Sequence, residues 1–201
     1  TDPDTVAFMG RAAAEGLLAA GVLPIVKHMP GHGRTRVDSH HDLPVLDVAL
    51  DALDARDFAP FRALAELLSL ELFSPTWESR HGAALGLREL FRTQGAGGGR
   101  RVGVSHASNA ARHAVWAEDL AVRLLCVFAL DRLGDFVFDQ VVAPVRETAS
   151  QTLAQLLPHM TGALVRQTHA VLLEMIRQDT IKAPDAQQGA RRAEYVWEVR
   201  H

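Results

Sequence analysis

A five-residue sequence occurs twice in this chain of 201 residues. Residues 77–81 read Trp-Glu-Ser-Arg-His, and 120 positions later residues 197–201 read Trp-Glu-Val-Arg-His. A single closed domain has no reason to repeat a helix start, whereas stacked helix pairs of about 40 residues place such a start at equivalent points of successive repeats. The duplication therefore predicts a stack of helical hairpins. Because the second copy coincides with the end of the sequence, we expect a longer parent protein.

Helical patterning dominates the chain from about residue 64 onward. Apolar residues recur there at helical spacing, and Pro75, Pro158 and Pro184 fall at breaks between the periodic segments. The fold class predicted for this part is mainly α. The helices that we expect lie at residues 64–73, 76–91, 110–133, 141–157 and 163–177.

The first 62 residues follow a different pattern. A helix capped by Asp4 or Thr5 is expected to run to Ala20, and a β-branched run at residues 22–26 predicts a strand. A loop dense in Pro, Gly and His follows, and then a second helix at residues 48–56. Alternation of helix and strand builds parallel sheets and barrels, so this part is predicted to be a short α/β fragment.

Charge and apolar patterning exclude several classes of partner. The formal net charge is -3, so no overall positive field favours direct binding to nucleic acid or to an anionic membrane. The most apolar stretch, residues 120–130, contains Arg123 and is too short to span a bilayer. Cys126 is the only cysteine, which excludes an internal disulfide and fits a reducing compartment. With no signal peptide pattern at Thr1, we predict a nuclear or cytoplasmic location.

A glycine-rich stretch at residues 95–101 is the one candidate for a phosphate-binding loop. It lacks a preceding strand, a following helix and a Lys-Ser/Thr pair, so the sequence favours a flexible linker. Its surroundings are locally basic, and an acidic partner fits them. The basic residues are Arg100, Arg101, His106, Arg112 and His113.

The segment that is richest in potentially catalytic or ligand-binding side chains lies in the first half of the chain. Residues 27–33 read Lys-His-Met-Pro-Gly-His-Gly, and residues 38–40 read Asp-Ser-His. His28 and His32 have the spacing of a zinc pair on a helix, but Pro30 and the adjoining glycines disfavour a helix there. We therefore predict no metal and no other cofactor. Without further information the segment is also typical of an exposed, glycine-rich turn.

The full motif resembles glycoside hydrolase family 3, specifically its β-N-acetylglucosaminidase branch, and the resemblance covers nearly all of residues 1–64. It implies part of a (β/α)₈ barrel and retaining hydrolysis of a terminal N-acetylglucosamine in glycans such as bacterial cell-wall fragments. By the same resemblance, Lys27 and His28 would bind sugar hydroxyls, His40 would be the general acid/base, and Asp38 would orient its ring. A histidine suits that role because its ordinary pKa lies near neutrality.

A retaining hydrolase also needs a carboxylate nucleophile, which in this family comes from a later barrel strand. The sequence turns helical at about Ala63 before any such strand. We therefore expect residues 1–63 to be an incomplete barrel fragment without glycosidase activity.

Residues 64–201 resemble a second family, the HEAT-repeat region of the TATA-binding-protein-associated factor, a helicase-like ATPase that strips TATA-binding protein from promoter DNA. The resemblance rests on residues 72–89, 118–132, 134–136, 141–148 and 197–201. It implies an α-solenoid fragment that binds TATA-binding protein. No nucleotide-binding motif occurs in the sequence, so no ATPase activity is expected, and the residues that contact a partner stay unassigned.

The two resemblances meet near residues 62–66, and they leave three hypotheses. The leading one is a helical-repeat scaffold at residues 64–201. The alternative is a hydrolase fragment at residues 1–63 that acts on N-acetylglucosamine-containing saccharides. The third is that the join is an artefact of the gene model, in which case the chain is a chimera without one function.

Overall fold

The computed structural model describes residues 2–20, 22, 24–25, 34–133, 136 and 143–177. All regular secondary structure in these residues is helical, in seven α-helices joined by turns and short helical segments. The α-helices are α1 (Pro3–Ala19), α2 (Leu50–Ala52), α3 (Ala59–Glu71), α4 (Trp77–Gln94), α5 (His106–Leu133), α6 (Ala143–Leu156) and α7 (Gly162–Arg177). The prediction of a mainly α fold is therefore confirmed.

The first helix begins earlier than predicted. Asp2 is the N-cap residue, and its side chain accepts a hydrogen bond from the backbone N of Thr5 at 2.9 Å. Hydrogen bonds from Thr5 hold the pKa of the Asp2 carboxyl below its ordinary value. Pro3 occupies the first turn, where its fixed φ suits a helix and its missing N–H costs nothing. The expectation that Asp4 or Thr5 would cap this helix was wrong because it overlooked that proline.

The predicted strand at residues 22–26 is absent from the described part of the chain. Val22, Pro24 and Ile25 have no regular structure, and residues 23 and 26 lie outside the described ranges. A strand is stable only when its backbone N–H and C=O groups pair with a neighbour. One isolated run of β-branched residues has no such neighbour, which explains why the β-propensity of this segment does not produce a strand.

The helix predicted at residues 48–56 is split in the structure. It consists of the single turn α2 and a π-helical turn, Leu53–Asp57. Pro60 then lies in the first turn of α3, which starts before the predicted boundary at residue 64. The other four predicted helices correspond to α4, α5, α6 and α7, although residues 141–142 of the predicted fourth one lie outside the described residues.

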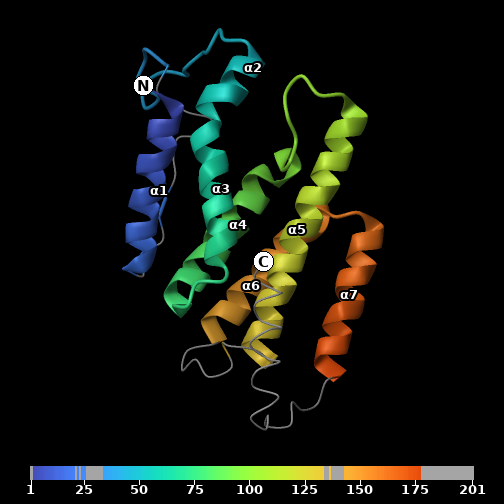
Figure 1. Cartoon of the computed structure of the whole chain (residues 1–201). Helices are drawn as coiled ribbons and strands as arrows, with labels where there is room; N and C mark the ends of the chain where they lie inside the picture. The colour runs from blue at the N-terminus through green and yellow to red at the C-terminus, as the bar shows by residue number, and fades with distance from the viewer. Residues whose placement is uncertain are drawn as a thin grey trace.

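The long helices form two layers (Figure 1). Helices α1, α3, α5 and α7 follow one another from left to right in the front of the view, and α4 and α6 lie behind them. The most extensive packing joins α4 to α6 and α1 to α3. Helices α3 and α4 also pack on each other, as do α5 and α6, and each of these pairs is consecutive in the chain. Helix α7 packs on α5 rather than on its chain neighbour α6.

A single large core runs through both layers. Leu68 and Leu72 of α3, Leu87 of α4 and Leu124 of α5 are buried in it. Leu18 of α1 belongs to the same cluster, so the N-terminal helix packs together with the later helices. No helix among the described residues is both long enough and apolar enough to cross a membrane.

The arginine of the repeated sequence is buried at the start of α4. Arg80 is completely inaccessible to solvent, and its Nη1 donates to the carbonyl oxygens of Ser74 at 2.9 Å and Pro75 at 3.1 Å. Its guanidinium also stacks 3.7 Å from the ring centroid of Phe136. These contacts offset the cost of burying the charge and fix the turn between α3 and α4. The second copy, residues 197–201, lies outside the described residues.

Polar side chains also tie α4 to α6 within the back layer. Thr152 donates to the carbonyl oxygen of Ala84 at 2.8 Å, and His81 Nδ1 lies 3.1 Å from Thr148 Oγ1. Because buried hydrogen bonds require one particular register, they fix how these two helices stack.

Candidate functional site

His40 and Asp38, predicted to be the general acid/base and the residue that orients it, lie in contact in an exposed turn. The Nδ1 atom of His40 lies 2.7 Å from Oδ1 of Asp38, which also accepts the backbone N–H of His40 at 2.9 Å. The two side chains are 75% and 59% exposed. A carboxylate that accepts from Nδ1 favours the tautomer with the proton on that nitrogen, so in the predicted acid/base role Nε2 would be the atom that exchanges a proton with a substrate.

The local backbone explains why these side chains meet. The carbonyl oxygen of Asp38 accepts the N–H groups of His41 and Asp42, each at 3.0 Å, which closes a tight turn over Ser39 and His40. An aspartate at the start of such a turn bonds the backbone two residues on. The Asp-Ser-His order therefore produces the pairing by itself, without help from a barrel.

One ion pair connects this segment to the π-helical turn, and a second connects that turn to α3. Arg34 Nε lies 2.9 Å from Oδ2 of Asp57 in the π-helical turn, and Arg62 Nη1 of α3 donates to Oδ1 of Asp54 at 2.8 Å. The sequence pattern pairs neither Arg34 nor Arg62 with an aspartate. These pairs were hard to predict because each includes an aspartate of the π-helical turn, a segment for which the sequence pattern predicts a different helix.

The structure does not describe the predicted sugar-binding residues. Lys27 and His28 lie outside the described residues, so their predicted roles stay predictions. Within the described ranges, no three side chains of His, Cys, Asp or Glu are grouped so as to hold a metal ion.

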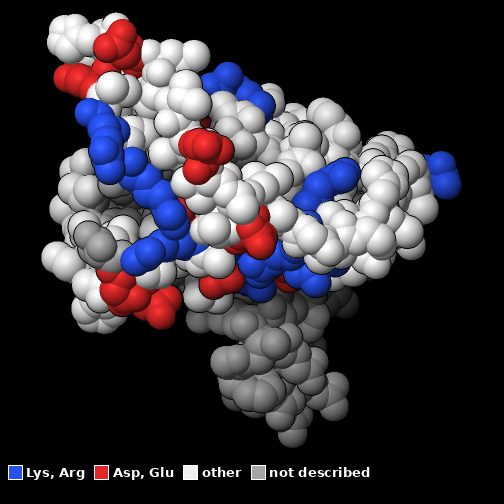
Figure 2. All heavy atoms as spheres, turned by 90° about the horizontal axis from the view of Figure 1, so that it is seen from above, with Lys and Arg blue, Asp and Glu red and all other residues white. Residues whose placement is uncertain are grey.

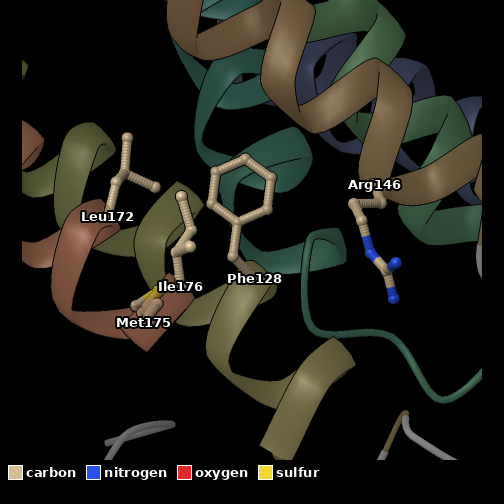
Figure 3. A pocket seen from close by; sticks show the side chains of 5 residues that line it. All are labelled: Phe128, Arg146, Leu172, Met175 and Ile176. Carbon is tan, nitrogen blue, oxygen red and sulfur yellow. The ribbon is translucent and has the colours of Figure 1, made fainter. Parts of the chain in front are cut away.

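A shallow apolar groove of about 180 Å³ lies between α5, α6 and α7. In Figure 3 the ring of Phe128 stands between the α7 side chains Leu172, Met175 and Ile176 on one side and Arg146 of α6 on the other. Arg146 lies at 2.6 Å from the buried Asp131, so its charge is paired. Hydrophobic periodicity alone did not identify this groove, because its lining comes from three separate helices whose packing a periodic pattern does not show.

The glycine-rich stretch is built into the structure rather than left as a flexible linker. It forms a helical turn at Gly95–Gly97. The carbonyl oxygen of Gly98 lies 2.7 Å from Nδ1 of His113, and Gly99 adopts a φ of 69°, which only glycine reaches without strain. A Cβ on Gly98 would come within 2.5 Å of the ring of Trp116. The glycines therefore allow the backbone to lie directly against α5.

Comparison with known proteins relates the chain to two families. Residues 1–70 match the Glycosyl hydrolase family 3 N terminal domain. The beta-hexosaminidase LpqI of Mycobacterium tuberculosis is 48% identical over 64 residues, which are 32% of this chain and 16% of that protein.

The larger part of the chain matches TATA-binding protein-associated factors. The human TATA-binding protein-associated factor 172 is 45% identical over 142 residues, which are 71% of this chain and 7% of that protein. The factor mot1 of Schizosaccharomyces pombe is 39% identical over 166 residues, 83% of this chain and 8% of that protein. The chain thus spans less than a tenth of the length of these relatives.

The chain is therefore homologous to these factors over most of its length and to the hydrolase domain at residues 1–70. The two matches overlap. Residues 64–201 number 138, fewer than the 166 matched in the Schizosaccharomyces pombe protein, so that match extends to the N-terminal side of residue 64.

Proposed function

We propose that residues 64–201 are a HEAT-type scaffold fragment that binds TATA-binding protein and has no ATPase activity of its own. The observation that carries this proposal is the homology to TATA-binding protein-associated factors over 71% to 83% of the chain. The name of those relatives states their association with TATA-binding protein, and the proposal transfers that partner to this chain. A nuclear or cytoplasmic location is part of the same proposal.

The helix arrangement supports a repeat architecture. Hairpins α3/α4 and α5/α6 each contribute one helix to the front layer and one to the back layer (Figure 1). The back helices α4 and α6 pack directly on each other, as neighbouring repeats do in a solenoid. Under this proposal residues 1–63 are a separate, hydrolase-like fragment, and α1 packs on the first hairpin from outside the repeats.

The test is a binding assay with the full chain and purified TATA-binding protein. We expect an immobilised chain to retain TATA-binding protein. The matched control is the double variant Asp38→Ala/His40→Ala, which changes only the exposed turn and should bind equally. Failure of both chains to retain TATA-binding protein while their helical content is intact would refute the scaffold proposal.

The second candidate function is that of a β-N-acetylglucosaminidase fragment. The 2.7 Å approach of Asp38 to His40 and the family match at residues 1–70 favour it. A retaining reaction needs a second carboxylate about 5 Å from the acid/base group to attack the sugar. In our proposal that nucleophile belongs to barrel strands that this sequence does not supply, so the chain does not turn over substrate.

The enzymatic alternative is tested with 4-nitrophenyl N-acetylglucosaminide. We expect no release of nitrophenolate from the purified chain above the buffer rate. Release that disappears in His40→Ala and persists in the neighbouring variant His41→Ala would establish the hydrolase function and displace the scaffold proposal as the leading one.

A further inference from the structure

Positive charge is concentrated in two segments that adjoin in space. Residues 90–117 contain four arginines, two histidines and no carboxylate, and residues 157–173 contain Arg166 and no carboxylate. The rings of His113 and His159 connect the two segments, with their centroids 6.2 Å apart. In a chain whose net charge is -3, these two adjoining segments thus carry cations and no carboxylate of their own.

The cations of this surface are exposed and available for an intermolecular contact. Arg100, Arg101, Arg112 and Arg166 are all exposed. None of these four forms an ion pair with another described residue, whereas the nearby Arg92 is paired with Glu89 at 2.8 Å. Unpaired, clustered cations raise the local concentration of anionic groups.

The loop that carries the first two cations is held rigidly. The side chain of Asn109 accepts the backbone N–H of Arg101 at 2.8 Å and donates to the carbonyl oxygens of Arg101 at 2.9 Å and Val104 at 3.2 Å. Arg112 Nε donates to the carbonyl oxygen of Gly99 at 3.1 Å. A preformed backbone reduces the entropy that binding would otherwise cost.

Apolar side chains lie within the same segment. Val104 and Val115 are exposed, the second by 66%. Figure 2 looks down on the end of the molecule where α5 begins, and toward the right of the view blue atoms recur among white ones while red atoms are scarce. The left of that view shows both colours. The surface therefore combines cations with small apolar areas rather than presenting charge alone.

From these observations we propose that the loop between α4 and α5, together with the start of α7, is a docking surface for an acidic peptide segment of a partner protein. We name its four cations, Arg100, Arg101, Arg112 and Arg166, the basic surface. Carboxylates of the partner pair with the arginines, and its apolar side chains contact Val104 and Val115.

A short acidic peptide fits this surface better than a nucleic acid does. Duplex binding relies on many phosphate contacts along a continuous basic stripe. Here the four cations of the basic surface lie in two short segments, and Glu89 and Glu118, which bound the first segment, would repel a longer polyanion. This inference does not depend on TATA-binding protein, because it identifies the partner segment by its charge.

The test measures fluorescence anisotropy of a labelled peptide rich in Asp and Glu with interspersed Leu, titrated with the full chain. We expect binding at low salt that weakens as the ionic strength rises from about 0.05 to 0.3 M, because screening shortens the reach of the charges. The variant Arg100→Gln/Arg101→Gln should bind about tenfold more weakly, as expected for two exposed ion pairs. Arg100→Glu/Arg101→Glu should abolish binding.

The matched control is Arg11→Gln/Arg36→Gln, which removes the same charge from exposed positions in the N-terminal region. It should bind the peptide as the unaltered chain does. If both double variants weaken peptide binding equally, the effect comes from net charge alone, and the proposal is overturned. Absence of binding at low salt, or tighter binding to a DNA duplex of equal charge than to the peptide, would also overturn it. Helical content measured by circular dichroism verifies that each variant is folded.

Discussion

The N-terminal region up to residue 58 and the helices from α3 to α7 use their apolar side chains in opposite ways. In the first region Phe8 is 74% exposed and Leu43 is 87% exposed, and of its described residues only Ala14 and Leu18 are buried. In the second, Leu67, Ala84 and Leu124 are completely buried. Helical hairpins bury their apolar faces on immediate neighbours, whereas a lone βα segment needs distant strands to cover it.

Helix α1 keeps its helical structure because it packs on α3 and α4 in place of a β-sheet. One face of α1 places Ala14 and Leu18 against α3 and α4. Its other faces leave Val6, Phe8, Met9 and Leu17 exposed. A helix with a partner for one stripe keeps its structure, while residues 22 and 24–25, which have no sheet to join, do not form a strand.

The largest contrast should appear when equivalent leucines are truncated in the two regions. Leu124→Ala removes a side chain that is completely buried in the main core, and we expect the free energy of unfolding to fall by about 3 kcal/mol through lost burial and a residual cavity. Leu43→Ala, at an exposed position, should change it by less than about 0.5 kcal/mol. Urea denaturation followed by circular dichroism measures both. Comparable losses would contradict the division into a packed and an unpacked region.

The buried arginine of the repeated sequence gives the next largest effect. Arg80→Ala removes the donor to the carbonyl oxygens of Ser74 and Pro75 and the stacking on Phe136. We expect a loss of about 2 kcal/mol in the free energy of unfolding, because buried carbonyl groups are left unsatisfied. The matched control is Arg88→Ala on the same helix, whose side chain is 30% exposed. If both variants lower the free energy of unfolding by the same amount, the repeated arginine is not what fixes the start of α4.

A glycine pair tests whether α1 belongs to the core of the later helices. In Gly82→Ala the new Cβ would lie 2.7 Å from Cδ2 of Leu18, so that side chain must move, and we expect a loss of about 1 kcal/mol. In the background Leu18→Ala the same change should cost less, because the clash is gone; a double-mutant cycle measures this coupling. Gly10→Ala, which meets nothing within 4 Å, should instead stabilise α1 by up to about 1 kcal/mol. If the effects of Gly82→Ala and Leu18→Ala on the free energy of unfolding are additive, α1 is not part of the core of the later helices.

Much of the helical part could be predicted from the sequence because its signals are local. Periodic apolar residues and proline breaks located α4, α6 and α7 to within a few residues. The Asp38 and His40 pairing also follows from adjacent residues in one turn. What depends on the whole fold was missed: the groove beside Phe128, the ion pair of Asp131 with Arg146, and the packing of the glycine-rich loop.

The errors at residues 22–26 and in the glycine-rich stretch share one physical cause. Propensity at residues 22–26 predicts a strand, but whether a strand forms depends on partners that propensity does not describe. The glycine-rich stretch suggested flexibility for the same reason, since glycine permits both a mobile linker and a close approach of backbone to a ring. Trp116 decides between these outcomes, and its proximity to Gly98 is a tertiary fact.

The smallest predicted effect concerns the start of α1, which is stabilised by the N-cap residue Asp2. Asp2→Ala removes the acceptor for Thr5 N–H, so we expect faster hydrogen exchange in the first turn of α1 and no change in α4. The pKa of Asp2 is lowered from its ordinary value of 3.8 in the folded chain, so its stabilising contribution is present above that value and is lost as the pH falls through the folded pKa. Exchange in this turn should therefore lose its dependence on Asp2 in strongly acidic solution. Asp4→Ala, one of the two caps expected from the sequence, is the control, and an effect equal to that of Asp2→Ala would mean that the helix start is held by general acidity near its N-terminus rather than by one specific hydrogen bond.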